Sequence, residues 1–299
     1  MVVARSRSVL ITGCSSGIGR CVAAGLKQRG YRVFATARKQ QDVRMLTDEG
    51  FESCRLDLAN SASIQAAVET VLDATDGRIY GLFNNAGYGQ PGALEDITRD
   101  SLREQFEVNL FGSHELTTLL IPAMRKQGEG RIIQHSSVLG FIALKYRGAY
   151  NASKFAIEGL ADTLRMELAG SGIHVSLIDT GPVTSNFRVN AYAAFRRNID
   201  RNNSFYKDIY ATIERRLSSD DDETPFTMGP EAVLDKVIHA LESRHPKARY
   251  YVTLPTYAFA FLKRVLPDRL MDWILIKASG AEHRQFSHAS QVKKKKPVS

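Results

Sequence analysis

Short apolar runs alternate with longer amphipathic stretches over the first 180 residues of the chain. Runs typical of buried strands occur at 9–11, 33–36, 79–83, 132–133 and 175–178. Helical periodicity occupies 17–29, 61–75, 99–126 and 150–169, and Pro122 predicts a kink in the third of these helices. Strands and helices that alternate in this way form β-α-β units. The pattern therefore predicts an α/β fold: one Rossmann-type, doubly wound parallel sheet of about seven strands, with helices on both faces.

The pattern changes after residue 186. Aromatic residues and arginines are interleaved from 186 to 226, which predicts a helical excursion that contributes to a substrate pocket. Regular structure resumes with a helix at 230–243 and a strand at 249–254. Two short amphipathic stretches, separated at Pro267, then make up 256–279. We expect one domain over residues 1–280, followed by a disordered basic tail at 281–299, which is polar and lacks periodicity.

Composition narrows the class of protein. With 43% hydrophobic and 24% charged residues, the chain is an ordinary soluble globular protein. The net charge is +8, and four of the positive charges lie in the run Lys293–Lys296. We find no basic face that would bind nucleic acid. Three cysteines without C-x-x-C spacing predict neither disulfides nor a metal site, and favour a reducing compartment. The N-terminus is unlike a signal peptide and no apolar segment reaches about 18 residues, so we expect a cytoplasmic protein.

A glycine-rich turn directly follows the first strand and opens the first helix. It reads Thr12-Gly-Cys-Ser-Ser-Gly-Ile-Gly19. Glycines let the backbone turn tightly against a pyrophosphate, and the helix N-terminus offers free N–H groups and a positive dipole end. The turn therefore predicts dinucleotide binding. Cys14 within it has the setting that lowers a thiol pKa, but we interpret it as a small filler rather than a redox switch.

A tyrosine and a lysine share one helix face. Tyr150 and Lys154 are four residues apart, so their side chains emerge together. A nearby ammonium, together with a positive nicotinamide ring, would lower the tyrosine pKa from its free value near 10. Ser137, thirteen residues before Tyr150, ends a predicted strand, where its hydroxyl can bind a substrate oxygen.

Several motifs together resemble the short-chain dehydrogenase/reductase family over about 9–255. They are the T-G-x-x-x-G-I-G turn, Asn84-Asn85-Ala86-Gly87, Asp57 after the third strand, Ser136-Ser137, Tyr150-Asn-Ala-Ser-Lys154 and Gly181-Pro-Val183. One departure is Thr180, where the family usually has proline, which predicts a slightly altered nicotinamide pocket. The resemblance implies that the cofactor is held by Gly13, Ser15, Ser16, Gly17, Ile18, Gly19, Arg38, Asp57, Leu58, Asn85, Ala86, Gly87, Tyr150, Lys154, Gly181 and Val183.

The end of the second strand decides between the two nicotinamide cofactors. An acidic residue there would bind a ribose 2′-hydroxyl and repel a 2′-phosphate. This chain has Ala37 at that place and Arg38 next to it. A guanidinium holds a phosphate through paired hydrogen bonds, so the sequence predicts NADP(H).

The resemblance also implies a catalytic tetrad of Asn109, Ser137, Tyr150 and Lys154. In it Ser137 orients and polarises the substrate, Tyr150 transfers the proton and Lys154 tunes Tyr150 and binds ribose. Asn109 holds a water in the proton relay to Lys154. We interpret Ser136 as a structural residue. The chain is most similar to the branch with 17β-hydroxysteroid dehydrogenases, retinol dehydrogenases and bacterial aldehyde reductases, which implies an aldehyde, ketosteroid or retinoid substrate.

Two other functions stay open at this point. One is a non-catalytic NADPH-binding sensor, which the intact tetrad argues against. The other is a membrane-surface binding protein that acts through its tail. Residues 256–279 carry apolar side chains beside basic ones, so they can cap the substrate pocket or lie in a membrane interface. We expect a substrate lid with at most reversible membrane contact, in a homodimer or homotetramer.

Overall fold

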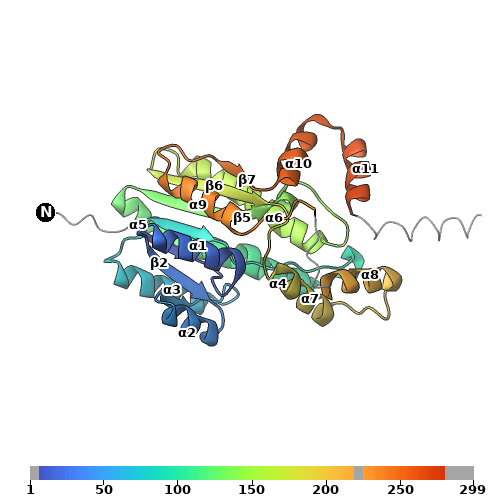
Figure 1. Ribbon diagram of the computed structural model, residues 1–299, viewed down its shortest axis with the longest axis horizontal. Coiled ribbons are helices and arrows are strands. Elements are labelled where there is room, and N and C mark those ends of the chain that lie inside the picture. The colour runs from blue at the N-terminus through green and yellow to red at the C-terminus, as the bar shows by residue number, and fades with distance from the viewer. Residues whose placement is uncertain (1–6, 219–224, 280–299) are drawn as a thin grey trace, which may run out of the picture.

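Seven parallel strands form one sheet in the computed structural model, which describes residues 7–218 and 225–279 (Figure 1). Their order across the sheet is β3-β2-β1-β4-β5-β6-β7. They are β1 (Ser8–Ile11), β2 (Arg32–Ala37), β3 (Glu52–Arg55), β4 (Gly81–Asn84), β5 (Gly130–Ser137), β6 (Ile173–Thr180) and β7 (Arg249–Tyr251). The strand order reverses between β1 and β4, and ligands of such sheets bind beyond the strand ends at this point. The predicted doubly wound fold is confirmed.

Helices connect and cover the strands. Those that connect the strands or cover the sheet are α1 (Gly17–Gln28), α2 (Gln40–Asp48), α3 (Ser61–Ala74), α4 (Arg99–Phe106), α5 (Gly112–Gln127), α6 (Gly148–Glu167) and α9 (Glu231–Glu242). Four further helices are α7 (Phe187–Asn198), α8 (Lys207–Ser218), α10 (Leu254–Val265) and α11 (Asp268–Ala278). Short 3₁₀ turns lie at Leu94–Asp96 and Val138–Gly140.

Successive residues of a strand serve two separate cores. On β1, Val9 and Ile11 pack with the apolar faces of α1, α2 and α9 on one side of the sheet. Leu10 points the other way and packs with α3, α5 and α6. Because side chains alternate along a strand, a short run of apolar residues such as this one is buried on both faces. This explains why the strands read as continuous apolar runs in the sequence.

The predicted helix at 99–126 is interrupted. Helices α4 and α5 are joined by a π-helical segment at Glu107–Phe111, and α5 runs through Pro122 to Gln127. The irregularity therefore lies upstream of the proline, and it contains Asn109. Helix α2 was not predicted, because only Val43 and Leu46 of its nine residues are buried.

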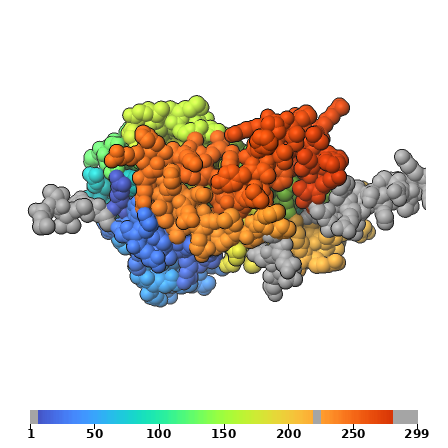
Figure 2. Space-filling model, turned by 45° about the horizontal axis from the view of Figure 1, so that its top comes forward, coloured from blue at the N-terminus to red at the C-terminus, as the bar shows by residue number. Residues whose placement is uncertain are grey.

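Four helices gather at one end of the molecule. In Figure 1, α7 and α8 lie on one side of this end and α10 and α11 on the other. Figure 2 shows the C-terminal segment spread over the surface here. Pro267 separates α10 from α11 as predicted, whereas the strand expected at 249–254 is shorter because α10 already begins at Leu254. The tail at 281–299 lies outside the described residues. Within 7–218 and 225–279, no helix combines the length and apolar character that crossing a membrane requires.

Candidate active site

The glycine turn leaves the first turn of α1 open. Gly13 and Gly17 have φ of +73° and +55°, a region in which other residues are strained. A Cβ on Gly19 would lie 2.2 Å from the Gly13 carbonyl oxygen, so only glycine fits there. The N-cap residue Ser16 makes no side-chain capping bond to α1. An uncapped helix N-terminus behind a close-packed glycine turn fits the pyrophosphate of a dinucleotide.

The loop after β4 is fastened to this turn. The Asn85 side-chain amide donates to the carbonyl oxygens of Thr12 and Gly13 at 2.9 and 3.3 Å. The buried Thr12 hydroxyl accepts from the backbone N–H groups of Asn85 and Ala86 at 2.9 and 2.8 Å. Two of the predicted cofactor segments are thus held together at the point where the strand order reverses.

Basic side chains surround a depression at the ends of β2 and β3. It has a volume of about 710 Å³ and is lined by Arg38, Lys39, Gln40, Gln41, Arg55 and Asp57. Arg55 donates through Nε to the Arg38 carbonyl at 3.2 Å. The sequence analysis did not include Arg55, whose place beside Arg38 depends on the pairing of β2 with β3. Three basic side chains, those of Arg38, Lys39 and Arg55, therefore line this depression.

Ser137, Tyr150 and Lys154 converge at the end of β5. The Lys154 Nζ atom lies 5.7 Å from the centre of the Tyr150 ring. Ser137 is the last residue of β5, and its hydroxyl neighbours Tyr150 and stabilises the phenolate form of that side chain. The same hydroxyl donates to the Thr180 carbonyl at 3.3 Å and accepts from the Leu139 N–H at 3.1 Å. The backbone thereby fixes the position of Ser137.

Burial has the largest effect on the pKa values of Tyr150 and Lys154. It raises the pKa of Tyr150 to about 12, against the opposing effect of Ser137, so the phenol is neutral at pH 7. Burial outweighs the effect of Ser137 in this structure, and the lowering of the pKa by Lys154 together with a positive nicotinamide ring stays a prediction. The Lys154 Nζ instead donates to the His135 carbonyl at 2.7 Å. Burial lowers the pKa of Lys154 to about 8, although Glu158 and Asp179 counteract it.

Asn109 is held by the loop that follows β4. Its side-chain amide donates to the Tyr88 carbonyl at 3.0 Å and to the Ser153 hydroxyl at 3.1 Å. Its Oδ1 atom accepts from the Tyr88 N–H at 3.1 Å. The π-helical segment gives Asn109 this orientation, on the side of α6 that also carries Ser153. A role in a proton relay remains a prediction.

Two long-range contacts extend the site beyond the predicted residues. The Phe187 ring of α7 packs edge-on against Tyr150, with 5.2 Å between ring centres. Tyr150 also borders an apolar cluster that joins the 138–142 turn to the inner faces of α10 and α11. This cluster consists of Leu139, Ile142, Met271 and Leu275, with Val138, Phe141, Leu144, Tyr150, Phe259, Leu262 and Leu266 packed on it. Apolar helices thus surround the tyrosine on two sides.

His135 and Thr180 form a bridge that sequence reasoning missed. The His135 Nδ1 atom hydrogen-bonds the Asn85 Oδ1 at 3.1 Å, and its Nε2 atom hydrogen-bonds the Thr180 hydroxyl at 3.2 Å. Burial lowers the pKa of His135 to about 3, so the ring is neutral. The threonine in place of proline therefore has a partner. Gly181 follows it, where a Cβ would lie 2.1 Å from the Thr253 hydroxyl.

The other predicted cofactor residues occupy the same edge of the sheet. Asp57 accepts from the Ala59 N–H at 3.1 Å. The carbonyl of Leu58 approaches α5 so closely that a Cβ on Gly112 would lie 1.9 Å from its oxygen. Gly87 adjoins the Asn109 side chain, and Val183 makes an isolated β-bridge with Met228. Ser15 and Ile18 lie within the glycine turn.

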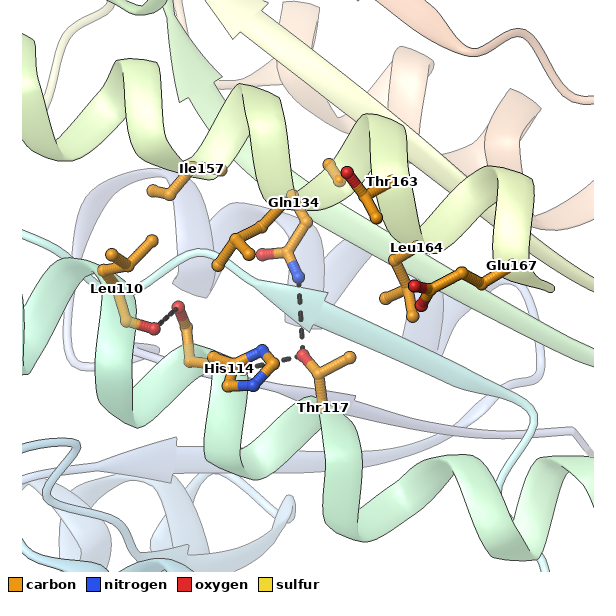
Figure 3. Close-up of a pocket in the computed structure, with 11 residues that line it drawn as sticks. Leu110, His114, Thr117, Gln134, Ile157, Thr163, Leu164 and Glu167 are labelled. Carbon is orange, nitrogen blue, oxygen red and sulfur yellow. Dashed lines mark hydrogen bonds between the residues drawn. The ribbon is translucent and has the colours of Figure 1, made fainter.

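A second cavity lies elsewhere, between α5 and α6. It has a volume of about 220 Å³, and Figure 3 shows residues of both helices and Gln134 of β5 around it. None of the predicted site residues lines it. Cys14 is also outside the chemistry, because its burial raises the thiol pKa to about 12. The interpretation as a filler of the turn, rather than a reactive thiol, agrees with this.

Comparisons with known proteins agree with this arrangement. The family model described as short chain dehydrogenase matches residues 7–194. The uncharacterized oxidoreductase YbbO of Escherichia coli strain K12 is 46% identical over 269 residues, which cover 90% of this chain and 94% of that protein. The 17-beta-hydroxysteroid dehydrogenase type 1 of Homo sapiens is 32% identical over 262 residues, covering 82% and 77%. A crystal structure of a short-chain dehydrogenase from Streptomyces avermitilis has a TM-score of 0.74 and 27% identity, covering 93% and 99%.

The chain therefore belongs to the short-chain dehydrogenase family. It is an oxidoreductase that uses a nicotinamide cofactor and acts on small carbonyl or alcohol substrates. The predicted family and its branch are confirmed.

Proposed function

We propose that the protein is an NADP(H)-dependent oxidoreductase that transfers a hydride between nicotinamide and the carbonyl or alcohol carbon of an apolar substrate of the aldehyde, ketosteroid or retinoid class. The observation that carries this proposal is the convergence of Ser137, Tyr150 and Lys154 beside the glycine turn and within reach of an apolar cluster.

The choice of NADP(H) rests on charge. Arg38, Lys39 and Arg55 line the depression at the ends of β2 and β3, and among the described residues Asp57 is its one acidic lining residue. Guanidinium groups bind a phosphate bidentately, whereas they offer a ribose hydroxyl little advantage. We infer that this depression receives the 2′-phosphate of the cofactor.

Proton transfer follows from the protonation states. Bound in the site, NADPH supplies the hydride that reaches the substrate carbonyl carbon. The neutral Tyr150 phenol donates its proton to the carbonyl oxygen as that oxygen gains charge. Ser137 orients the same oxygen, and the ammonium of Lys154 stabilises the phenolate left behind. Asn109 supports return of the proton from solvent. In the oxidative direction the same groups act in reverse.

The apolar surroundings support a hydrophobic substrate. Phe187 covers Tyr150 from α7, while Phe259 and Leu262 approach its cluster from α10. A carbonyl on an apolar body would replace contacts with water by contacts with these side chains. We infer that the excursion at 186–226 and the helices at 256–279 act as pocket wall and lid.

The outer face of the lid supports reversible contact with a membrane surface. Leu254 and Phe261 on α10 are 62% and 64% exposed, and Trp273 on α11 is 54% exposed. Basic side chains, Arg264 and Lys277, stand beside them. Short amphipathic helices of this kind lie in the interface of a bilayer. We therefore propose at most reversible contact with a membrane surface, and we propose, as the sequence predicts, a cytoplasmic homodimer or homotetramer.

The test of this function is a panel of apolar aldehydes, retinoids and ketosteroids, followed by the loss of NADPH absorbance. We expect turnover with NADPH and an apolar carbonyl. Tyr150→Phe should bind NADPH without oxidising it. Equal NADPH oxidation by wild type and Tyr150→Phe would contradict the proposal, and binding without turnover by the wild type would favour a sensor.

A further inference from the structure

Buried oxygen atoms without donors gather next to Lys154. Glu158 lies one turn further along α6 and is 7% exposed, whereas Asp179 on β6 is completely buried. Within the described residues, Glu158 Oε1, Ser136 Oγ and both carboxyl oxygens of Asp179 have no hydrogen-bond partner. Buried polar groups are nearly always paired, so a cluster of such atoms requires an explanation.

These atoms occupy one place in the fold. Ser136 and Asp179 stand opposite each other in the parallel pairing of β5 and β6. A Cβ on Gly140 would lie 2.6 Å from Ser136 Oγ and 3.0 Å from Glu158 Oε1, so both oxygens lie close to the Gly140 backbone. Asp179 neighbours both groups, and its pKa is raised by burial and by the Glu158 carboxylate.

Charged groups flank the two carboxyls on both sides. Glu158 Oε2 accepts from the Nε and Nη2 atoms of Arg249 on β7, at 3.1 and 2.7 Å. Arg249 is shared with Asp162 of α6, which also accepts from Arg165. Towards the active site stand the ionisable side chains of Tyr150 and Lys154 on α6 and the neutral ring of His135 on β5. Tyr251 of β7 completes the surroundings, and burial is the main cause of its raised pKa.

We propose that Asp179 and Glu158 share one proton and act together as positioning residues for Lys154, which deepens and rests on the proposed function. A proton on Asp179 is donated to Glu158 Oε1, and the Ser136 hydroxyl donates to the other Asp179 oxygen. Each unpartnered atom then has a partner. The pair carries a single negative charge between Arg249 and Lys154, which keeps the lysine protonated beside Tyr150.

Two substitutions separate the charge from the shape of the pair. Glu158→Gln removes the shared negative charge. In the wild type this charge opposes the lowering of the Lys154 pKa by burial. The alkaline limb of the kcat/KM profile should therefore move to lower pH by about one unit. Asp179→Asn keeps the charge on Glu158, because an amide N–H donates as the protonated carboxyl does. Its profile should match the wild type, as should that of Glu167→Gln, an exposed acid on the same helix.

The experiment measures these pH profiles on the full chain with NADPH and an apolar aldehyde. Infrared spectra at neutral pH provide a readout without turnover. We expect a protonated-carboxyl band that shifts in D₂O, is present in the wild type and is absent from Asp179→Asn. Equal pH shifts in Glu158→Gln and Asp179→Asn, an unmoved limb in Glu158→Gln, or no such band in the wild type would each overturn the proposal.

The experiments distinguish failure of the proposed function from failure of the shared-proton proposal. A wild type that turns over no carbonyl contradicts the proposed function, while the infrared band still decides whether the proton is shared. If Glu158→Gln does not fold because Arg249 keeps only Asp162 as a carboxylate partner, the infrared band of the wild type and the pH profile of Asp179→Asn test the proposal.

Discussion

The strands of the sheet and the C-terminal helices use apolar side chains in opposite ways. Every residue of β1 is buried, and its side chains are covered on both faces of the sheet by helices of the same chain. Helix α10 buries Thr256 and Ala260, yet it exposes Leu254, Tyr257, Phe261 and Val265 on its outer side. The apolar side chains of the sheet therefore need no partner outside the chain. The exposed apolar side chains of α10 are available to contact a molecule other than this chain, either substrate or lipid.

The comparison separates residues that hold the fold from residues that define the substrate. The proposed cofactor and catalytic groups stand on α6, on the ends of buried strands and on the segments that follow these strands. The side chains proposed to face the substrate stand on helices whose outer faces are exposed. Chemistry should therefore be sensitive to small changes in the first region, and substrate preference to changes in the second.

The largest effect should follow the loss of the Tyr150 hydroxyl. Because proton donation by a positioned group contributes on the order of 10²–10⁴-fold, Tyr150→Phe should lower kcat by that factor or more. NADPH affinity, measured by fluorescence titration, should stay within about twofold, since no binding contact changes charge. Tyr257→Phe on the exposed side of α10 is the matched control and should leave kcat unchanged. A similar loss in both variants would remove the distinction between the two regions.

The free energy of unfolding should also depend more on the buried strands than on the outer face of α10. Leu10→Ala opens a cavity in a fully buried strand and should cost about 2–5 kcal/mol in urea unfolding. Phe261→Ala removes a side chain that is 64% exposed, so its effect should stay within about 0.5 kcal/mol. A large loss in Phe261→Ala would mean that the outer face of α10 is covered in solution.

Cofactor choice should respond more modestly. Arg38→Ala should weaken NADPH binding by about 1–3 kcal/mol, the range for hydrogen bonds to charged groups, and leave NADH binding unchanged. Arg55→Ala tests whether the residue found only in the structure takes part, and should show a smaller loss of the same kind. Calorimetric titration with both cofactors measures this. Equal losses for NADPH and NADH would refute a 2′-phosphate site.

The smallest effect should appear in substrate preference. Leu262→Ala removes apolar contact area from the inner side of α10, so KM for long apolar carbonyls should rise by roughly fivefold, or about 1 kcal/mol. Short carbonyls should be unaffected, because they do not reach the lid. Phe261→Ala on the outer side is the control. If short and long substrates change alike, α10 does not act as a lid.

Local signals made most of the fold and site predictable. Apolar runs located most of the strands, but not β3, which has no buried residue. The glycine turn and the Tyr150–Lys154 spacing are each contained in a few consecutive residues. Helix α2 escaped notice because it has so few buried side chains. Arg55, Phe187 and His135 depend on strand pairing or on packing between distant segments, which periodicity does not contain. The raised pKa of Tyr150 likewise depends on burial, a property of the folded chain.

The central claim is hydride transfer to an apolar carbonyl at Tyr150, and isotope transfer tests it most directly. Full-length enzyme is incubated with NADPH that carries deuterium at the transferred position of its nicotinamide ring, together with a long-chain aldehyde or a ketosteroid, and the alcohol is analysed by mass spectrometry. The account predicts one deuterium on the carbinol carbon, at a rate that Tyr150→Phe abolishes. Oxidation of NADPH without deuterium in the alcohol, or equal incorporation by Tyr150→Phe, would contradict it.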